Sequence, residues 1–440
     1  MSRLRITKWL LRLILVPTIA VFVLLAIVLR LGPYAFAMVQ EDAASPTGLQ
    51  LASAPYSKRG PHQVGTRKLA SDGVSARAAT IWYPARSGGG RSITYAYELK
   101  LFAPLGRLAI ATHQGRAGRD APYDLESGPY PLVVLSPGYA IGSGSYAWLA
   151  EHLASYGLVV ISPEPDEELD PAQIWRSTIT RPHALRTLLA YVDDQLRPGG
   201  GFHGLIDRDR TAVIGHSYGG YTALAAAGAR LDTDAFKARC DAEHAARGPN
   251  TWLCDALVPH LADMAELAGL ERVPSGLWPA SGAPGVDAVV SMAGDAYLFD
   301  RAGLAEISVP VMAIGGTADT DTPYTWGTQP TYDFTSSTSK AKVTLHAAGH
   351  MIFTGPCDHV RRFMKILPGG FCSDSTWRRD RAQALIRHFT TAFLLAELSG
   401  DSDASAALAR TGNRFLGSHR VTLRRSGAMG GAWQGRRERS

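Results

Sequence analysis

The sequence has few features of a fibrous, repetitive or disordered protein. Its 45 glycines show no triplet period, and it contains neither a heptad run nor a longer repeat, which argues against collagen, coiled-coil and solenoid architectures. Only 19% of the 440 residues are charged and 46% are apolar, so the chain can bury a large core. The four cysteines include no C-x-x-C pair, which disfavours a zinc site.

Basic residues are concentrated at the two ends of the chain. Residues 1–37 hold five Lys or Arg and no acid, and residues 410–440 hold eight Arg and one Glu. The body between them keeps 32 basic and 38 acidic residues, so the formal charge of +6 comes from the ends. A nucleic-acid-binding domain needs basic residues on a folded face, and we therefore expect no nucleic-acid partner.

The N-terminal segment has the pattern of an export signal. Basic residues precede an apolar run from Leu13 to Leu29, and Ala35-Phe36-Ala37 is a small-x-small cleavage site. The alternative is an uncleaved anchor that associates with the membrane through residues 9–31, since the run is at the lower limit of a bilayer span. Both interpretations of residues 1–37 predict export of the body, to the periplasm or the extracellular space.

The cysteines agree with export, because disulfides persist in oxidising compartments. Two local pairs, Cys240–Cys254 and Cys357–Cys372, each enclose a loop rich in turn-forming residues. A disulfide that closes a loop of this size contributes about 3 kcal/mol in the chain-entropy model. Four cysteines allow three connectivities, and we predict these two local disulfides; four free thiols are the alternative.

The body alternates between short apolar runs and helical patterns. Continuous apolar runs, typical of strands buried on both faces, occupy 131–136, 157–162, 211–215, 286–292 and 309–314, and an alternating run at 341–346 indicates an edge strand. Helical patterns occupy 145–156, 182–196, 217–228 and 376–398, with Pro182 expected in a first turn. Runs at 64–69 and 78–84 suit an antiparallel edge. The sequence therefore predicts the α/β class, with a mostly parallel sheet and helices on both faces.

We expect one domain over residues 38–402. The segment 229–284 interrupts the alternation with two cysteines and several Pro and Gly. We interpret it as a lid-like insertion over the carboxyl edge of the sheet. Residues 403–440 form an Arg/Gly-rich tail without sustained periodicity, which indicates a loosely attached end.

A serine on a strand-to-helix turn is the clearest chemical signal. The motif Gly215-His216-Ser217-Tyr218-Gly219 follows the third apolar run and opens an Ala-rich helix. Its glycines allow close approach of strand and helix, which places the Ser217 hydroxyl at a helix N-terminus where backbone N–H groups can stabilise an oxyanion. We predict Ser217 as a nucleophile, because the motif lacks the lysine of a phosphate-binding loop. His216 is expected to point away and pack beneath the turn.

The other two members of a triad should follow in chain order. A serine hydroxyl is a weak nucleophile without a base, and His350 stands four residues after the last run. The acid that orients this base should come after an earlier strand. Asp319 and Asp321 follow the fifth run and Asp295 follows the fourth. Asp319 is the favoured candidate, and the other two remain open.

An oxyanion hole needs two backbone N–H groups. The first belongs to Tyr218, directly after the nucleophile. The second should come from the loop after the first apolar run, Ser136-Pro137-Gly138-Tyr139. Gly138 allows the backbone to turn inward, and we expect the amide of Tyr139 to act with that of Tyr218.

Together these segments resemble the α/β-hydrolases of the dienelactone-hydrolase-like group. The chain is similar to platelet-activating-factor acetylhydrolases and to bacterial cutinase-type polyester hydrolases in LSPGY (135–139), YAWLAEHLASYGLVVISPE (146–164), GHSYGG (215–220), GTADTDTP (316–323) and AGH (348–350). The similarity spans roughly residues 62–400. It implies an α/β-hydrolase fold, with the family's serine, acid and histidine at Ser217, Asp319 and His350 and an oxyanion amide at Tyr139.

The resemblance implies an exported serine carboxylic-ester hydrolase that forms an acyl-enzyme and needs no cofactor and no metal. Two departures favour short-chain acyl esters over polymers: Tyr218 replaces the methionine of many cutinase-like members, and the insertion would crowd an open groove. Dienelactone hydrolases proper use a cysteine nucleophile, so their substrate is not expected. The alternatives are a phospholipid acylhydrolase, a lipase or a polyesterase on the same triad, with a small-molecule or lipid ester as partner. A surface or binding protein that has lost catalysis is the alternative from another class.

Overall fold

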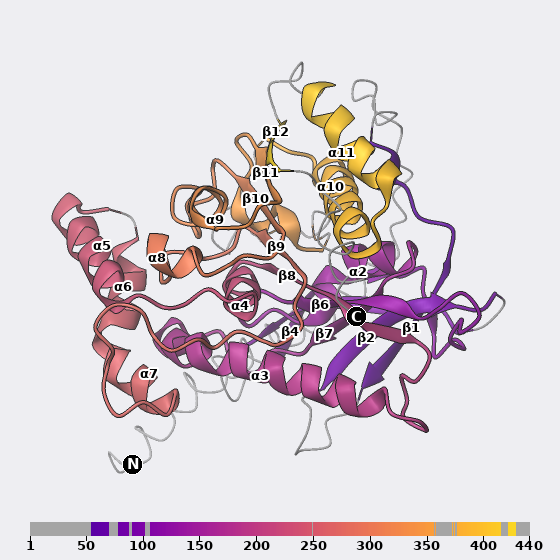
Figure 1. The fold of residues 1–440 in the computed structure, drawn as a ribbon, viewed down its shortest axis with the longest axis horizontal. Helices are drawn as coiled ribbons and strands as arrows, with labels where there is room; N and C mark the ends of the chain where they lie inside the picture. Colours follow the sequence, from indigo (N-terminus) through magenta and orange to yellow (C-terminus); the bar gives the residue numbers. More distant parts are fainter. Residues whose placement is uncertain are drawn as a thin grey trace, which may run out of the picture.

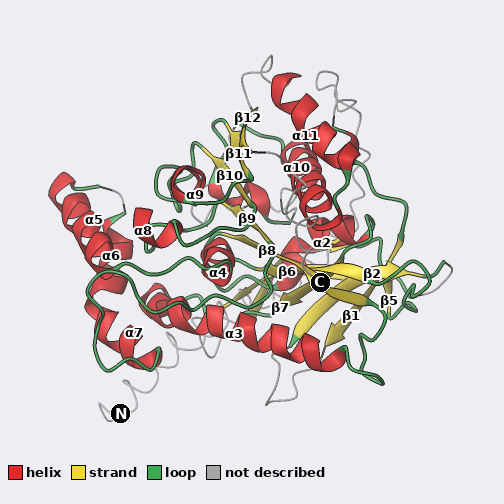
Figure 2. Cartoon of the chain, in the orientation of Figure 1, coloured by secondary structure: helices red, strands yellow, loops and turns green. Residues whose placement is uncertain are grey.

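The computed structural model describes residues 54–69, 78–87, 90–101, 106–248, 250–355, 357, 372, 374, 376–414 and 421–427. The predicted signal or anchor at residues 1–37 lies outside this part of the chain. Among the described residues, no helix combines the length and the apolar character that a bilayer span requires. The described chain forms a mixed sheet with helices on both sides (Figures 1 and 2).

A ten-stranded sheet organises the molecule, in the order β12-β11-β10-β9-β8-β6-β7-β2-β1-β5. Its strands are β1 (Gln63–Leu69), β2 (Ala79–Ala85), β5 (Gly118–Arg119), β6 (Tyr130–Ser136), β7 (Val159–Pro163), β8 (Ile206–His216), β9 (Ala288–Met292), β10 (Val311–Gly316), β11 (Lys340–Leu345) and β12 (Val421–Ser426). The six strands from β7 to β11 in this order pair in parallel. Antiparallel pairs join β2 to β1 and β7, and β12 to β11.

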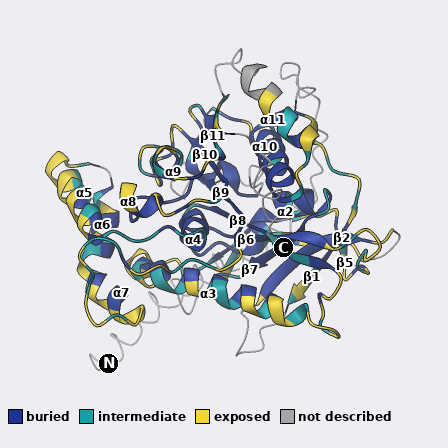
Figure 3. Cartoon of the chain, in the orientation of Figure 1, coloured by how far each residue is buried: buried dark blue, intermediate teal, exposed yellow. Residues whose placement is uncertain are grey.

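The central strands are buried on both faces, as their continuous apolar runs predict. Val133 and Leu135 of β6 pack into the core on one side of the sheet, and Leu132 and Val134 pack into the core on the other. Figure 3 shows the middle of the sheet as buried along its length. The α/β class predicted from the sequence is confirmed.

Helices cover the two faces of the sheet. They are α2 (Ala147–Ala154), α3 (Ile174–Gln195), α4 (Tyr218–Ala226), α5 (Thr233–Ala246), α6 (Thr251–Leu257), α7 (Leu261–Leu267), α8 (Asp300–Leu304), α9 (Thr328–Phe334), α10 (Arg379–Ser399) and α11 (Ser402–Arg414). Short 3₁₀ turns are η2 (Pro55–Ser57), η3 (Ser143–Tyr146), η4 (Pro171–Gln173), η5 (Val258–His260) and η6 (His350–Phe353). Apolar residues of α2 and α10 share one core, and those of α3, α4 and α5–α7 share the other.

The position of Pro182 differs from the prediction. It was expected in a first turn, but α3 begins at Ile174 and continues through the proline. A proline inside a helix leaves the carbonyl four residues before it without its usual N–H partner. Here that carbonyl belongs to Thr178, and the Tyr221 hydroxyl donates a hydrogen bond to it over 2.9 Å. The tertiary contact replaces the missing backbone bond, so the helix does not have to end.

Two predictions for the edges are wrong. The run at 341–346 is not an edge strand, because β12 pairs with β11 along six residue pairs. The tail is therefore not loosely attached throughout, since residues after 403 contribute most of α11 and all of β12. A two-stranded sheet, β3 (Thr94–Lys100) and β4 (Arg107–Gln114), was not predicted from the sequence.

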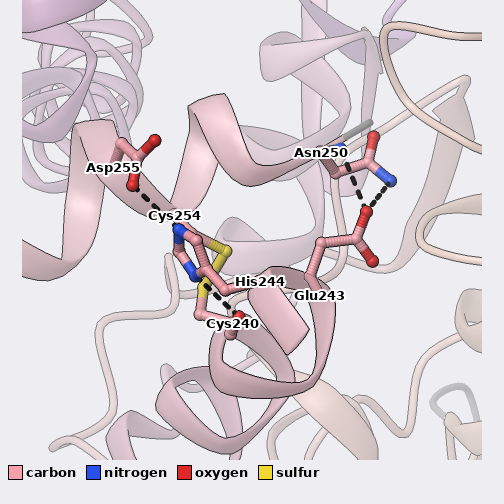
Figure 4. The surroundings of a disulfide bond; sticks show 6 residues. All are labelled: Cys240, Glu243, His244, Asn250, Cys254 and Asp255. Carbon is pink, nitrogen blue, oxygen red and sulfur yellow. Dashed lines mark hydrogen bonds and ion pairs between the residues drawn. A yellow bond between two sulfur atoms is a disulfide. The ribbon is translucent and has the colours of Figure 1, made fainter. Parts of the chain in front are cut away.

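The segment 229–284 forms a small helical unit. It contains α5, α6 and α7, which gather at one end of the molecule beyond α4 (Figure 1). The disulfide Cys240–Cys254 joins α5 to α6 with an S–S distance of 2.09 Å. Beside it, His244 of α5 contacts Asp255 of α6 over 2.9 Å (Figure 4). The two helices are therefore tied by a covalent bond and by a polar contact.

Candidate active site

Ser217 lies on the sharp turn between β8 and α4. Its backbone has φ 58° and ψ −126°, a conformation that residues other than glycine rarely adopt. The Ser217 N–H donates to the Met292 carbonyl over 3.0 Å. A Cβ at Gly215 would stand 2.0 Å from the Gly219 carbonyl, and one at Gly219 would stand 2.0 Å from the Ser136 carbonyl. Both positions therefore require glycine, and the half-buried serine projects from a strained turn.

The structure brings His350 and Asp319 together. His350 opens η6 after β11, and its Nδ1 lies 2.8 Å from Asp319 Oδ2 in the loop after β10. Asp319 Oδ1 accepts hydrogen bonds from the backbone N–H groups of Asp321 (3.0 Å) and Thr322 (2.8 Å). The histidine and aspartate side chains are only 7% and 1% exposed. Both carboxylate oxygens are thus held, and the pair is shielded from water.

Among the described residues, no side-chain hydrogen bond or ion pair joins either of the other two candidate acids to His350. Asp321 is exposed, and its backbone rather than its side chain contacts Asp319. Asp295 is buried, and its Oδ1 accepts a hydrogen bond of 2.8 Å from Thr322 Oγ1. Burial raises the pKa of Asp295 to about 7. Within the described ranges, no group of three or more His, Cys, Asp or Glu side chains is placed to hold a metal ion.

The charge of Asp319 acts on His350. Burial alone would lower the pKa of His350, but the adjacent carboxylate and its hydrogen bond outweigh that effect and raise the pKa to about 9. The imidazolium form is therefore stabilised in place. This arrangement suits a base that accepts a proton during the reaction.

The second disulfide begins seven residues after His350 in the chain. Cys357 and Cys372 are joined, as the sequence predicts, with an S–S distance of 2.02 Å. Two residues beyond it, Asp374 Oδ2 accepts a hydrogen bond of 2.7 Å from the Gly349 N–H. The disulfide therefore restrains a carboxylate that holds the backbone next to the candidate base.

The candidate oxyanion donors are on neighbouring loops. The rings of Tyr139 and Tyr218 meet edge to face, with centroids 5.9 Å apart. Among the described residues, neither backbone N–H has a hydrogen-bond partner. The next residue, Ala140, has a φ of 56°. We call residues 137–140 the oxyanion loop, because they include Tyr139, the candidate donor.

A buried ion pair clamps the oxyanion loop. Arg181 of α3 donates to the carbonyl of Pro137 over 2.6 Å and to that of Gly138 over 3.0 Å. Glu167 pairs with the same guanidinium and accepts the Ala140 N–H over 3.4 Å. Burial disfavours the charged form of Glu167, but Arg181 outweighs this and holds its pKa below the ordinary value. Sequence reasoning missed both residues, because a charged side chain within a polar stretch gives no sign of burial.

His216 lies beneath the turn, as expected, and it is fully buried. Its two ring nitrogens lie 2.9 Å from Tyr146 Oη and 3.1 Å from the His350 carbonyl. It therefore does more than fill space, because it connects the nucleophile turn to the segment of the candidate base. Tyr146 was not singled out from the sequence, where it reads as one apolar residue of a helical pattern.

Comparisons with known proteins find related sequences over part of the chain. Residues 111–244 match the family model described as PETase: PET hydrolase-like. The resemblance to the polyester-hydrolase group of α/β-hydrolases is confirmed. The PET hydrolase-like segment contains Ser217, Tyr139 and Tyr218, whereas Asp319 and His350 lie beyond it.

Curated relatives carry related names. Cutinase 2 of Thermobifida cellulosilytica is 35% identical over 121 residues, which cover 28% of this chain and 43% of the relative. Cutinase cut1 of Thermobifida fusca is 35% identical over the same length, covering 35% of that protein. A bis(hydroxyethyl) terephthalate hydrolase of Streptomyces coelicolor is 25% identical over 230 residues, covering 52% of this chain and 53% of the relative. The chain thus spans about half or less of the length of these relatives.

Proposed function

We propose that the chain is an exported serine carboxylic-ester hydrolase of the α/β-hydrolase fold. Ser217 Oγ attacks the ester carbonyl while His350 accepts its proton, and Asp319 orients the imidazole and stabilises its charged form. The amides of Tyr139 and Tyr218 hold the oxyanion. His350 then protonates the departing alcohol, and water releases the acid from the acyl-enzyme. No step requires a metal or an organic cofactor.

One observation carries this proposal: the 2.8 Å contact between His350 and Asp319. Ser217 on its strained turn directly follows His216, whose ring centroid lies 4.8 Å from that of His350. A protein that had become a binding module would need neither this buried histidine–aspartate pair nor a serine on a strained turn. The cysteine pairs and the secreted-type N-terminus support export, in the periplasm or outside the cell.

Replacement of the nucleophile tests the function. Ser217→Ala should reduce hydrolysis of a p-nitrophenyl ester to background, a loss of about 10⁴–10⁶-fold, because triad members act as one unit. A fluorophosphonate probe should label the wild-type protein and leave Ser217→Ala unlabelled. A folded Ser217→Ala protein that keeps most of the activity would exclude the mechanism, and an unreactive wild type would favour the binding-protein alternative.

A matched pair of aspartates tests the acid. Asp319→Asn should lower kcat by about 10³–10⁴-fold, since the amide cannot stabilise the charged histidine. Asp321→Asn should change it less than about threefold, because that side chain is exposed and does not contact His350. The reverse ranking would assign the role to Asp321.

We propose short acyl esters as the preferred substrates. The helical unit 229–284 packs on the segments beside the site: Phe236 contacts Tyr297 at 5.9 Å between ring centroids, and Arg239 lies 5.5 Å from the centre of the Trp326 ring. A lid-like unit in this position would limit the acyl chain, because each buried CH₂ contributes about 0.8 kcal/mol only while it fits. The names of the relatives, cutinases and a bis(hydroxyethyl) terephthalate hydrolase, favour a second candidate, an aromatic ester or polyester.

A single substrate series separates these candidates. We expect activity on p-nitrophenyl esters to peak at about two to six acyl carbons and to fall on triglyceride emulsions. Bis(hydroxyethyl) terephthalate and a polyester film test the second candidate, and release of soluble acid from the film would establish polyester cleavage. A jump in rate when an emulsion forms, with long chains preferred, would instead indicate a lipase.

A further inference from the structure

A chain of three buried hydrogen bonds runs beneath the candidate active site. The Gly138 N–H lies 3.0 Å from Tyr146 Oη, which lies 2.9 Å from His216 Nδ1. His216 Nε2 in turn lies 3.1 Å from the His350 carbonyl. The side chains of Tyr146 and His216 are both 0% exposed, so water does not compete for these bonds.

The backbone groups at the two ends of this series, the Gly138 N–H and the His350 carbonyl, determine which atom donates in each hydrogen bond. A backbone carbonyl can only accept, so His216 Nε2 must carry a proton and donate to His350. Burial, followed by the nearby His350, lowers the pKa of His216 well below its ordinary value, so the ring is neutral and Nδ1 has no proton. The Tyr146 hydroxyl therefore donates to Nδ1. Its oxygen is then free to accept the Gly138 N–H, which can only donate.

The three bonds connect three separate segments of the chain. Gly138 belongs to the oxyanion loop after β6, His216 is the last residue of β8 and immediately precedes Ser217, and His350 follows β11. Packing leaves little freedom at the first of these points, because a Cβ on Gly138 would stand 3.0 Å from Tyr146 Oη. The ring of His216 also lies against that of His350, with centroids 4.8 Å apart.

We infer that Tyr146 and His216 form a positioning relay that sets the oxyanion loop and the His350 segment relative to Ser217. The inference rests on the proposed function, since it assigns these two residues to the same site. Neither residue touches the substrate. The relay instead keeps the Tyr139 amide and the His350 ring in register with the serine, where a displacement of about 1 Å can cost about 10²-fold in rate.

Removal of one hydroxyl tests the relay. Tyr146→Phe keeps the ring but leaves the Gly138 N–H without an acceptor and His216 Nδ1 without a donor. We expect kcat on a p-nitrophenyl ester to fall about 10–100-fold while KM changes less than about twofold, because the oxyanion is held only in the transition state. The inhibition constant of an aryl boronic acid, which mimics the tetrahedral intermediate, should rise in parallel with the loss in kcat/KM.

A second tyrosine provides the matched control. The Tyr83 hydroxyl is also buried and donates to a backbone carbonyl, that of Ala121, over 2.8 Å, but it lies in β2 away from the site. Tyr83→Phe should lower the thermal midpoint to a similar extent and leave kcat unchanged. If Tyr146→Phe, measured well below its melting temperature, keeps a kcat within about twofold of the wild type, the positioning role is wrong.

Two substitutions at His216 each remove a different one of its two hydrogen bonds. His216→Asn retains an acceptor for the Tyr146 hydroxyl and removes the donor to His350, whereas His216→Gln can retain the donor and removes the acceptor. We expect both to lower kcat, and each combined with Tyr146→Phe to lower it less than the product of the single effects. Independent, multiplicative losses would overturn a single connected relay.

A spectroscopic measurement separates the relay from the proposed function. In protein with ¹⁵N-labelled histidine, His216 should show a protonated Nε2 and an unprotonated Nδ1 throughout the assay pH range, and Tyr146→Phe should shift the Nδ1 resonance. This result is expected in Ser217→Ala as well, where no esterase activity is needed. A protonated Nδ1 would refute the relay, whereas activity in Ser217→Ala would refute only the proposed function.

Discussion

His350 is the residue whose surroundings most constrain the chemistry. Asp319 contacts its Nδ1, Asp295 and Asp321 add negative charge nearby, and the neutral ring of His216 packs against it at a tilt of 37°. Because the resulting pKa is about 9, His350 is largely protonated at neutral pH in the protein without substrate. The stability that comes from this charged pair is fully present below pH 6.5, the ordinary pKa of the histidine, and is lost as the pH rises through about 9.

This shift predicts an alkaline activity profile. A base must be unprotonated to accept the serine proton. The value of kcat/KM should therefore rise with pH, with an inflection near the His350 pKa of about 9, and level off above it. The measurement is kcat/KM for a p-nitrophenyl ester against pH, corrected for spontaneous hydrolysis. Asp295→Asn should move the inflection to lower pH, because it removes a nearby negative charge. An inflection of the wild-type profile below pH 6.5 would contradict the assignment.

Replacement of Asp295 by asparagine should stabilise the protein at neutral and alkaline pH. Its buried carboxyl keeps a proton up to a pKa of about 7, against 3.8 ordinarily, so the stability linked to this proton is present below pH 3.8 and is lost as the pH rises through 7. Asp295→Asn keeps an acceptor for Thr322 and cannot ionise. We expect the variant to be more stable than the wild type by about 2–4 kcal/mol above pH 7, and equal to it near pH 4.

Denaturant unfolding at both pH values provides the check for Asp295→Asn. Activity should remain within about threefold of the wild type, since this carboxyl does not contact His350. A loss of three orders of magnitude would instead make Asp295 the catalytic acid. An equal effect on stability at both pH values would show that ionisation is not the cause.

Chain order alone leads from the sequence to three candidate site residues. Ser217, Asp319 and His350 each stand at the end of an apolar run that forms a parallel strand, and such ends meet at one edge of a sheet. Arg181, Glu167 and Tyr146 follow from no such rule. Their roles depend on which side chains meet across the core, and a local pattern does not contain that information.

The two disulfides differ at the level of the elements they join. Both close similar spans, with separations of 14 and 15 residues, so removal of either should cost about 3 kcal/mol through the unfolded chain. Cys240–Cys254 joins two helices of the 229–284 unit, whereas Cys357–Cys372 leads to the carboxylate that holds the Gly349 N–H. Their effects on activity should therefore diverge.

Paired alanine variants test this difference. The double variant Cys357→Ala/Cys372→Ala should lose about tenfold in kcat as well as stability, because the His350 segment loses a restraint. The matched double variant Cys240→Ala/Cys254→Ala should lose stability alone on small esters. Thermal midpoints and kcat below the melting temperature are the two measurements. Equal kcat in both variants would show that the second disulfide does not act on the site.

Strands and helices were predicted with unequal success for physical reasons. The apolar runs of β6 to β10 are buried on both faces, and burial leaves a signal in each residue type. β12 contains Thr422, Arg424 and Arg425, and only its pairing with β11 makes it a strand. Pro182 was predicted to begin a helix. The hydroxyl that compensates for its missing N–H belongs to Tyr221 of α4, 43 residues after Thr178 in the sequence, and no local pattern indicates that contact.

At the scale of the whole molecule, the sheet separates two hydrophobic cores that pack against different parts of the chain. The side with α2 and α10 also receives η2, where Arg387 of α10 donates to the Ser57 carbonyl over 3.2 Å, so the first described residues are held against α10. The other side receives the 229–284 unit. Because the 229–284 unit is on this second side, we expect substrate preference to depend on that side.

The pairing of β12 with β11 also bears on self-association of the chain. Without β12, β11 would present an open row of backbone N–H and carbonyl groups next to buried residues, and such an edge is a template for another copy of the chain. A protein truncated before Val421 should therefore self-associate with increasing concentration, as size-exclusion chromatography with light scattering would detect. That result would show that β12 prevents edge-to-edge association by covering β11. Its two arginines would contribute, because charged side chains on an edge strand oppose pairing with another chain.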